Sequence, residues 1–424
     1  MTPNGWRQAG LAEIADLAMG ETIIAKDLTG DGIPVFSAGR DSAPWGWTSK
    51  SRRVFGRGTI VLGARGTIGF PRLPTFERFV STQTTIAVAP TDAAVSEFLK
   101  YALERANFDD ITAKQAVPML TISALRPLSL LLPPLAEQRK IAAILSSVDD
   151  AIESTQAVID QLHVVKKAMM AELLTRGLPG RHTRFKQTEI GEVPEEWEVV
   201  RLGSLVAAGS SVTYGVVQPG PEDPAGVRFV RSGDVAAGHL REETLRTITR
   251  AVSDQYSRTV LRGGELLVAL VGQPGATLVA PQRLAGANIA RQVGLIQLGT
   301  RVSAEFVCLF LQSPSGLGGM LRETIGSVQQ VINLRDLEKI LVPAPDACEQ
   351  RDLVAVVAAI ADRQAVEHET LAGLLRIKSA LMSVLLTGEV RVTADERAVT
   401  SPPASGPPPP PEQGNAWSKN AARP

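Results

Sequence analysis

The chain lacks the features that mark several common classes of protein. Its 424 residues include only two cysteines, Cys308 and Cys348, which show no metal-binding spacing and suggest no disulfide framework, so a reducing compartment is expected. Lys and Arg number 44, as do Asp and Glu, and this zero formal net charge gives no global basic field that would predict a nucleic-acid partner. Because local patches decide contact, the balance disfavours DNA binding only mildly.

Long hydrophobic runs are also missing. Apolar runs such as the one near residues 128–132 are far shorter than the about 20 residues that cross a bilayer. Residues 1–6 do not have the pattern of a signal peptide. We therefore expect a soluble cytoplasmic protein with no membrane partner.

The motifs of common enzymes do not occur either. The sequence has no Gly-x4-Gly-Lys-Ser/Thr phosphate loop, no His-Glu-x-x-His zinc motif and no nucleophile elbow, and its four histidines are scattered. The glycines of residues 63–69 superficially resemble a cofactor loop, but a β-rich domain with tight turns explains them better. We expect no catalytic residue, no metal and no cofactor bound by this chain, and favour a binding scaffold.

The sequence does contain an internal repeat. Residues 135–175 and 347–387 have the same pattern, and Glu137 and Glu349, Lys166 and Lys378, and Thr175 and Thr387 are each 212 residues apart. A repeat of this length predicts two copies of one structural unit.

Both repeated segments are predicted to form long helices. Their apolar residues recur in alternating steps of four and three, which is the heptad pattern of a coiled-coil seam. The first helix follows Pro134 and runs to about Arg176, and the second follows Pro345 and ends near Gly388. We expect the helices to pack on each other as an antiparallel coiled coil; the alternative is that each packs on a separate domain. The predicted seam residues are Ile141, Leu145, Val148, Ile152, Ile159, Leu162, Met169, Leu173, Leu353, Val357, Ile360, Leu371, Leu374, Leu381 and Leu385.

Each predicted helix follows a segment of similar pattern. Trp6 and Trp197 begin these segments, and the anchors 120–125 and 332–337 end them, with about 21 extra residues in the second copy. Between the anchors, short β-rich runs alternate with glycines, and short helical stretches lie near 95–106 and 304–312, which predicts α+β domains. The predicted boundaries are 1–131 and 198–341 for two globular domains, 132–180 and 342–391 for two spacer helices, 181–197 for a linker and 392–424 for a disordered Pro-rich tail.

This order of elements suggests a partner. Two similar globules on an antiparallel helix pair imply pseudo-twofold symmetry, and duplex DNA is the obvious pseudo-twofold target. A helix of about 40 residues is a rod of about 60 Å, long enough to hold two reading heads about 34 Å apart, which is one turn of DNA. Because the globules differ in sequence, their half-sites should differ.

The polar residues of the globules agree with this interpretation. Basic residues cluster within residues 40–78, beside Trp45 and Trp47. Arg, Asn and Gln pair with base edges, whereas Ser, Thr and Tyr more often hold phosphate. Any single arginine here is explained as well by a solvated surface; the prediction of DNA contact rests on the cluster. The candidate DNA-binding residues are Arg40, Lys50, Arg52, Arg53, Arg65, Gln83, Thr84, Tyr214, Arg231, Ser232, Gln273, Asn288, Arg291 and Gln292.

The residues at the helix edges resemble those of a known family. Pro-Pro-Leu-Ala-Glu-Gln-Arg-Lys-Ile at 133–141, the segment 166–175 and Ile-Gly-Glu-Val-Pro-Glu-Glu-Trp at 190–197 are together similar to the specificity subunits of type I restriction–modification systems. The resemblance covers the chain up to about residue 392. The second copy departs from the pattern, with Pro-Ala-Pro-Asp-Ala-Cys at 343–348 and a more polar seam.

The resemblance implies that each globule is a target-recognition domain that reads one half of a split, asymmetric DNA site. It implies that the helices act as spacer and as docking surface for two modification subunits, which use S-adenosylmethionine to methylate adenine. Restriction subunits would add translocation and cleavage with ATP and Mg²⁺, and this chain would catalyse none of these steps. Two alternatives stay open: a DNA-binding adapter of an orphan or fused-enzyme methyltransferase system, and a coiled-coil assembly protein whose globules bind protein.

Overall fold

The computed structural model describes residues 3–51, 53–112, 118–236, 239–322 and 331–392. Arg52 and the predicted tail from residue 393 onward lie outside the described residues. Two compact units make up the chain: unit 1 is the described part of Met1–Ala151 and Leu374–Pro424, and unit 2 is the described part of Ile152–Gly373. None of the helices in the described ranges is long and apolar enough to cross a membrane.

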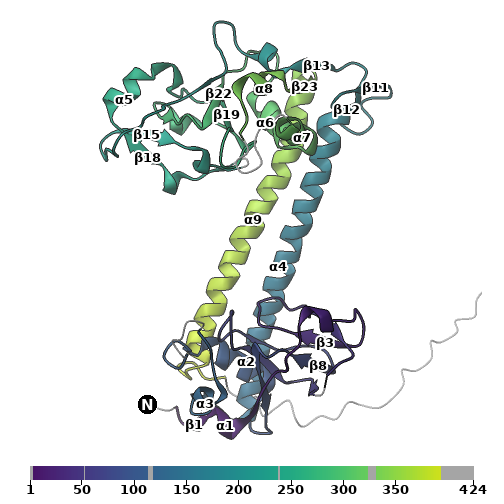
Figure 1. The fold of residues 1–424 in the computed structure, drawn as a ribbon, viewed down its shortest axis with the longest axis vertical. Helices are drawn as coiled ribbons and strands as arrows, with labels where there is room; N and C mark the ends of the chain where they lie inside the picture. The colour runs from purple at the N-terminus through teal and green to yellow at the C-terminus, as the bar shows by residue number, and fades with distance from the viewer. Residues whose placement is uncertain (1–2, 52, 113–117, 237–238, 323–330, 393–424) are drawn as a thin grey trace, which may run out of the picture. The chain divides into compact units, whose positions relative to one another are not determined.

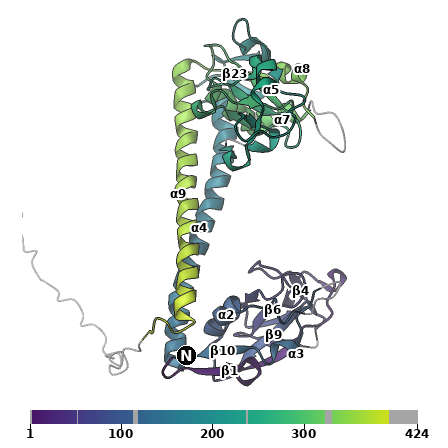
Figure 2. The ribbon, with the colours of Figure 1, turned by 90° about the vertical axis from the view of Figure 1, so that its left-hand side faces the viewer.

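Two long helices, α4 (Leu135–Arg176) and α9 (Ala347–Leu385), contribute one end to each unit. In unit 1 the start of α4 packs with the end of α9, where Ile141 and Leu385 share one buried cluster. In unit 2 the end of α4 packs with the start of α9, where Leu173 and Leu353 do the same. Within each unit the two helical segments run side by side (Figures 1 and 2), so the pair is antiparallel, as the heptad seams predict.

The sequence signals at the helix ends explain where the helices begin and end. Pro134 directly precedes α4, because proline fits the start of a helix and interrupts its interior. Gly177 follows α4 with φ of 76°, and Gly388 follows α9 with φ of 71°, a conformation that glycine adopts without steric cost. α4 therefore begins directly after Pro134 and ends at Arg176.

Among the described residues of unit 1, two four-stranded sheets form the body of the globule. One has the order β2-β9-β6-β7, and the other, β4-β3-β8-β5, contains the parallel pair β3–β8. A further pair, β1–β10, brings both ends of the globule to the start of α4. The strands are β1 (Arg7–Gly10), β2 (Ala15–Met19), β3 (Ile33–Phe36), β4 (Gly46–Thr48), β5 (Phe55–Gly56), β6 (Ile60–Gly63), β7 (Pro71–Arg72), β8 (Arg78–Ser81), β9 (Thr85–Pro90) and β10 (Ser129–Leu132).

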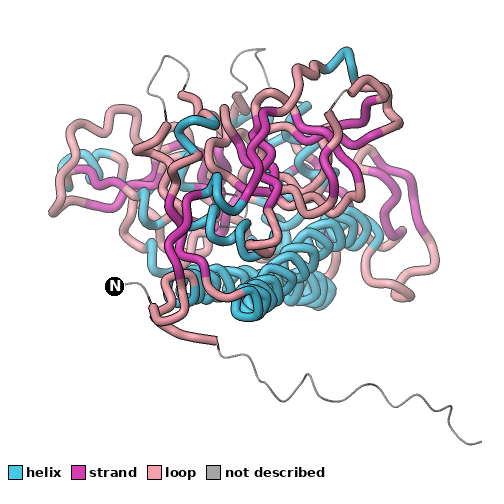
Figure 3. The backbone as a smooth tube through the Cα atoms, turned by 90° about the horizontal axis from the view of Figure 1, so that it is seen from below, coloured by secondary structure: helices cyan, strands magenta, loops and turns pink. Residues whose placement is uncertain are grey.

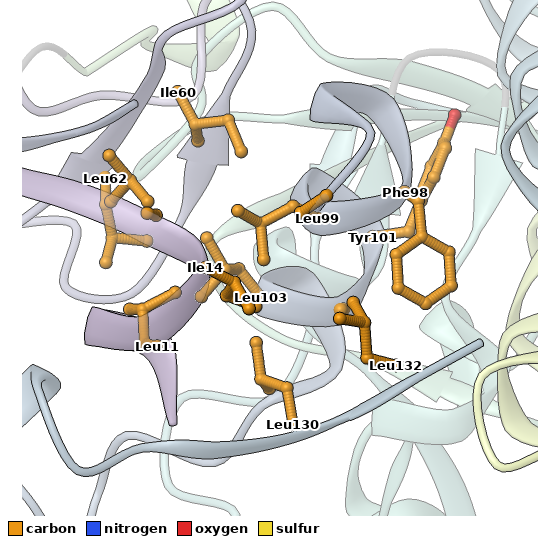
Figure 4. Close-up of a cluster of buried hydrophobic side chains, with 14 of the residues drawn as sticks. Leu11, Ile14, Ile60, Leu62, Phe98, Leu99, Tyr101, Leu103, Leu130 and Leu132 are labelled. Carbon is orange, nitrogen blue, oxygen red and sulfur yellow. The ribbon is translucent and has the colours of Figure 1, made fainter. Parts of the chain in front are cut away.

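The core of unit 1 forms around its short helices, α1 (Leu11–Ile14), α2 (Ser96–Arg105) and α3 (Ile122–Leu125), with η1 (Ala25–Asp27) at the periphery. Leu99 and Leu103 of α2 are fully buried together with Ile14, Leu130 and Leu132 (Figure 4). Burial of a leucine side chain contributes roughly 1.5–3 kcal/mol, so this cluster holds the helix on β10 and on the sheet.

Unit 2 has a four-stranded sheet, β14-β22-β19-β20, and a three-stranded sheet, β18-β15-β21, with β15 and β21 parallel. The strands of this unit are β11 (Phe185–Thr188), β12 (Gly191–Pro194), β13 (Glu198–Arg201), β14 (Thr213–Tyr214), β15 (Val227–Val230), β16 (Val235–Ala236), β17 (His239–Leu240), β18 (Arg246–Ile248), β19 (Leu266–Ala269), β20 (Thr277–Val279), β21 (Asn288–Ile289), β22 (Val293–Ile296) and β23 (Leu341–Ala344). Its short helices are η2 (Leu202–Leu205), η3 (Ser232–Asp234), η4 (Glu242–Thr244), α5 (Arg250–Gln255), η5 (Ser257–Thr259), η6 (Gln282–Leu284), α6 (Ala304–Gln312), α7 (Pro314–Arg322) and α8 (Leu334–Lys339).

The two units repeat one topology. The sheet β2-β9-β6-β7 corresponds to β14-β22-β19-β20, the parallel pair β3–β8 to β15–β21, and the pair β1–β10 to β13–β23. The strands of both units are short and joined by loops (Figure 3). The larger part of the extra length of unit 2 lies between β15 and β19, where it has α5 and the hairpin β16–β17. Residues 181–197, expected to be a linker, contain the hairpin β11–β12. The α+β class with two similar globules and paired long helices is confirmed.

Candidate nucleic-acid interface

The start of each long helix is held by the same tryptophan contact. The indole Nε1 of Trp6 donates a hydrogen bond to Glu137 Oε2 at 3.0 Å, and that of Trp197 donates to Glu349 Oε2 at 2.9 Å. Both tryptophans and both glutamates are buried. Each pair ties the first residues of a globule to the first turn of the helix that follows it.

The next residue of each repeat, a buried glutamine, holds a second segment. Gln138 accepts a hydrogen bond from the backbone N–H of Val95 at 2.8 Å, and its amide donates to the carbonyls of Ala93 and Pro133. In unit 2, Gln350 accepts from the N–H of Ser303 at 2.8 Å and donates to the carbonyls of Arg301 and Pro345. Val95 and Ser303 are the N-caps of α2 and α6. The glutamine therefore sets the position of this short helix in both units.

The negative charge of each glutamate meets a cation from the segment that follows the other long helix. In unit 1 the Arg391 guanidinium makes two hydrogen bonds to Glu137, at 2.8 and 2.9 Å. These bonds hold the pKa of the Glu137 carboxyl below its ordinary value. In unit 2, His182 Nε2 lies 2.8 Å from Glu349 Oε1, and Arg181 Nε lies 3.8 Å from Oε2. We call each of these contact sets a helix junction: Trp6, Glu137, Gln138 and Arg391 in unit 1, and Trp197, Glu349, Gln350, Arg181 and His182 in unit 2.

A charged cluster surrounds Lys378, a polar residue that takes a heptad position between Leu374 and Leu381 in the seam of the second copy. Lys378 Nζ of α9 lies 2.7 Å from Oε1 of Glu104 in α2 and 2.9 Å from Oδ1 of Asp149 in α4. Asp149 also accepts hydrogen bonds from Tyr101 and Lys100. Burial raises the pKa of Asp149, but the hydrogen bonds from Tyr101, Lys100 and Lys378 outweigh it, and the net pKa lies below its ordinary value. The lysine in the seam is therefore paired. All fifteen predicted seam residues are buried or half-buried.

The candidate DNA-binding residues Gln83, Thr84, Arg291 and Gln292 lie on equivalent loops. The loop that joins β8 to β9 holds the first two, and the loop that joins β21 to β22 holds the others. The backbone N–H of Gln83 donates to the carbonyl of Glu21 at 2.7 Å, and that of Arg291 donates to Val216 at 2.9 Å. Because these backbone bonds match, Gln83 corresponds to Arg291 and Thr84 to Gln292.

Two further candidates lie on turns that are bonded to these loops. Arg65 is on the turn between β6 and β7, and Gln273 is on the equivalent turn between β19 and β20, and both side chains are exposed. The N–H of Ala64 donates to the carbonyl of Thr84 at 2.8 Å, and the N–H of Leu270 donates to that of Gln292 at 2.8 Å. Each unit thus has one polar surface made from a loop and a turn, which we call the reading surface.

Other candidates lie around the reading surface of unit 1. The Arg40 guanidinium lies 5.3 Å from the centre of the Phe70 ring, on the turn that carries Arg65. The exposed Arg53 donates to the carbonyl of Met19 at 3.0 Å, and Lys50 is also exposed.

In unit 2, Ser232 is half-buried, and Tyr214 is 49% exposed on β14. Arg231 pairs with the buried Asp234, with Nη2 at 3.1 Å from Oδ1. This ion pair holds the Arg231 guanidinium in one orientation at the edge of the reading surface of unit 2.

The structure corrects the prediction for Asn288. Its side chain is fully buried, and its Oδ1 accepts a hydrogen bond from Thr259 Oγ1 at 2.7 Å. Its amide lies within 3.4 Å of polar atoms of Ser253 and Tyr256. The residue joins β21 to α5 and η5 and has no face toward solvent, because the short strand turns it inward. Residue type alone predicts a base contact at this position, and the burial of the side chain contradicts that prediction.

The sequence gives no signal for several polar residues beside the reading surfaces. In unit 1, Ser37 and Thr82 join Thr84 in a network of hydroxyl groups, with 2.7 Å between the Thr82 and Thr84 oxygens. In unit 2, Arg246 and Thr247 line a cavity next to Arg291. Within the described ranges, no group of three or more His, Cys, Asp or Glu side chains is arranged to hold a metal ion.

Taken together, the repeated topology, the matched helix junctions and the equivalent reading surfaces define a duplicated binding scaffold. Residues 3–164 match the model of the type I restriction modification DNA specificity domain. The chain is 28% identical over 292 residues to the EcoBI specificity subunit of Escherichia coli. This match covers 66% of this chain and 60% of that protein. It is 30% identical over 309 residues to the putative MjaX specificity subunit of Methanocaldococcus jannaschii, which covers 70% of this chain and 68% of that protein.

The fold has a solved counterpart. The type I restriction–modification S subunit from M. genitalium superimposes with a TM-score of 0.57 at 16% identity, covering 91% of this chain and 97% of that one. A second structure, of a type I restriction–modification system, gives a TM-score of 0.57 at 17% identity. The chain belongs to the family of type I restriction–modification DNA specificity subunits, and the family expected from the helix-edge motifs is confirmed.

Proposed function

We propose that each unit of this chain reads one half of a bipartite DNA site, with its reading surface against the bases. The observation that carries this proposal is the equivalence of the two surfaces. Gln83 and Arg291 occupy the same backbone position on matched loops, yet their side chains differ. Gln pairs best with adenine and Arg with guanine in the major groove. Two different half-sites require this combination of the same backbone position and different side chains.

The surrounding residues support the same role. Thr84 and Ser232 offer hydroxyl groups suited to phosphate oxygens, while the exposed Arg53 and Lys50 supply positive charge at the edge of the first surface. Phosphate contacts set the register of the protein on the duplex, and contacts to base edges supply the specificity. The formal net charge of zero is compatible with this role because the cations are local.

The paired helices serve as the spacer between the half-sites and as the docking surface for two modification subunits. Those subunits would bind S-adenosylmethionine and methylate adenine, and restriction subunits would add ATP- and Mg²⁺-dependent cleavage, while this chain contributes recognition only. Membership of the family and the antiparallel helix pair support this assignment. The complex would act in the cytoplasm.

The direct test is a genome-wide map of methylated adenines in a host with and without this gene, with the partner subunits present. We expect one bipartite motif, with two unlike halves and a fixed spacer, that disappears with the gene. A methylation pattern that does not depend on the gene would contradict the proposal. A salt series addresses the protein-binding alternative: affinity for the site should fall steeply with salt as counterions are released.

A further inference from the structure

Unit 2 contains a cavity beside its reading surface. Its volume is about 170 Å³, and its lining includes residues of β15 and β18, the loop that follows β14 and the loop that carries Arg291 and Gln292. Val216, Phe229 and Ile248 belong to one buried apolar cluster and form its inner wall. The cavity is therefore apolar inside and adjoins residues that we assign to DNA recognition.

The rim of this cavity carries three guanidinium groups. Arg231 is held by Asp234, and Arg246 Nε lies 3.2 Å from Glu222 Oε2, so both have carboxylate partners. Among the described residues, no carboxylate forms an ion pair with Arg291, whose side chain is exposed. The guanidinium of Arg291 at the rim thus remains for a contact with DNA.

We propose that this cavity binds a single nucleotide swung out of the DNA duplex. The inference rests on the proposed function, because the nucleotide belongs to the half-site that unit 2 reads. The apolar wall with Phe229 suits the face of a base, which is the contact that proteins use to hold an unstacked base. Gln292 at the rim supplies an amide for the edge of the extruded base, and Arg291 beside it can still contact the neighbouring base pair that stays stacked.

The proposal predicts an unusual response to mispairing. A base that leaves the duplex must break its pair and its stacking, and this cost is least where the base is already mismatched. A mismatch at the extruded position should therefore tighten binding. Within an ordinary stacked half-site, a mismatch should leave affinity unchanged or weaken it.

The experiment uses the complex with its modification subunits and a set of target-site duplexes, each with one base pair replaced by a mismatch. Val217 lies at the cavity and is 39% exposed, so Val217→Trp should fill the cavity from its mouth, and Val217→Ala is the matched control. At one position of one half-site, we expect the mismatch to tighten binding by about tenfold with the wild type and with Val217→Ala. With Val217→Trp this gain should vanish, while the melting temperature stays close to that of the wild type.

The outcomes separate the two proposals. If no mismatch tightens binding, or if the gain persists with Val217→Trp, the cavity does not hold a nucleotide; persistence at the methylated adenine would place the extruded base in the modification subunit. In either case the intact site would still be preferred over a scrambled duplex, and the proposed function would stand. Equal affinity of the wild-type complex for both duplexes would instead contradict the proposed function itself.

Discussion

At the scale of single residues, the glutamate at the start of each long helix is the most consequential side chain outside the reading surfaces. Glu137 is buried and accepts hydrogen bonds from Trp6 and Arg391. We expect Glu137→Gln to lower the free energy of unfolding by about 1.5–3 kcal/mol, the usual contribution of hydrogen bonds to a charged group. Denaturant titration of the full chain measures this loss. Glu192→Gln, at an exposed ion pair with Arg176, is the control and should cost less than about 1 kcal/mol.

The same residue predicts a dependence on pH. The pKa of Glu137 is lowered in the folded protein, chiefly by the hydrogen bonds from Arg391. Its contribution is therefore complete above the pKa of the unfolded carboxyl and is lost as the pH falls through the lower folded value. The stability difference between the wild type and Glu137→Gln should be constant near neutral pH and shrink in acid. A difference that grows in acid would contradict the assigned contacts.

The reading surfaces show what residue type alone can predict. As polar residues in loops, Gln83 and Arg291 are candidates from the sequence, and the structure places them on equivalent positions of the two units. Asn288 is a candidate on the same grounds, but its side chain is buried. Asn288 lies in the two-residue strand β21, whereas Arg291 lies in the loop that follows it. The inward direction of the Asn288 side chain depends on the pairing of β21 with β15. That pairing joins residues about 60 positions apart and leaves no local pattern in the sequence.

At the scale of elements, the long helices could be predicted and the sheets could not. The helices follow from a heptad spacing that local side chains specify, and from proline and glycine at their ends. The parallel pairs β3–β8 and β15–β21 depend on chain segments brought together from a distance. The hairpin β11–β12 lies in residues 181–197, which are too short and too polar to show a strand pattern.

The helices make a prediction of their own. Removing one heptad from each, residues 156–162 and 364–370, leaves both helix junctions intact. Seven residues of helix correspond to about 10 Å, or about three base pairs of DNA at 3.4 Å each. Mapping of the methylated motif should show a spacer shorter by about three base pairs with unchanged half-sites. An unchanged spacer would mean that the helices do not set the distance between the half-sites.

At the scale of the whole molecule, one topology occurs twice, and the residues on the reading surfaces of its two copies differ. The helix junctions repeat Trp, Glu and Gln in the same roles, and only the cationic partner of the glutamate differs. The reading surfaces have matching backbone hydrogen bonds but different side chains. Matched junctions with different surfaces are what independent reading by each unit requires, and we expect a change in one unit to leave the other unaffected.

Exchange of one globule tests this independence most directly. Residues 1–131 are replaced by the corresponding segment of a relative that methylates a different site, and the methylated motif is mapped in the same host. We expect one half of the motif to become that of the relative, while the other half and the spacer stay the same. A motif in which both halves change, or in which neither does, would contradict the account.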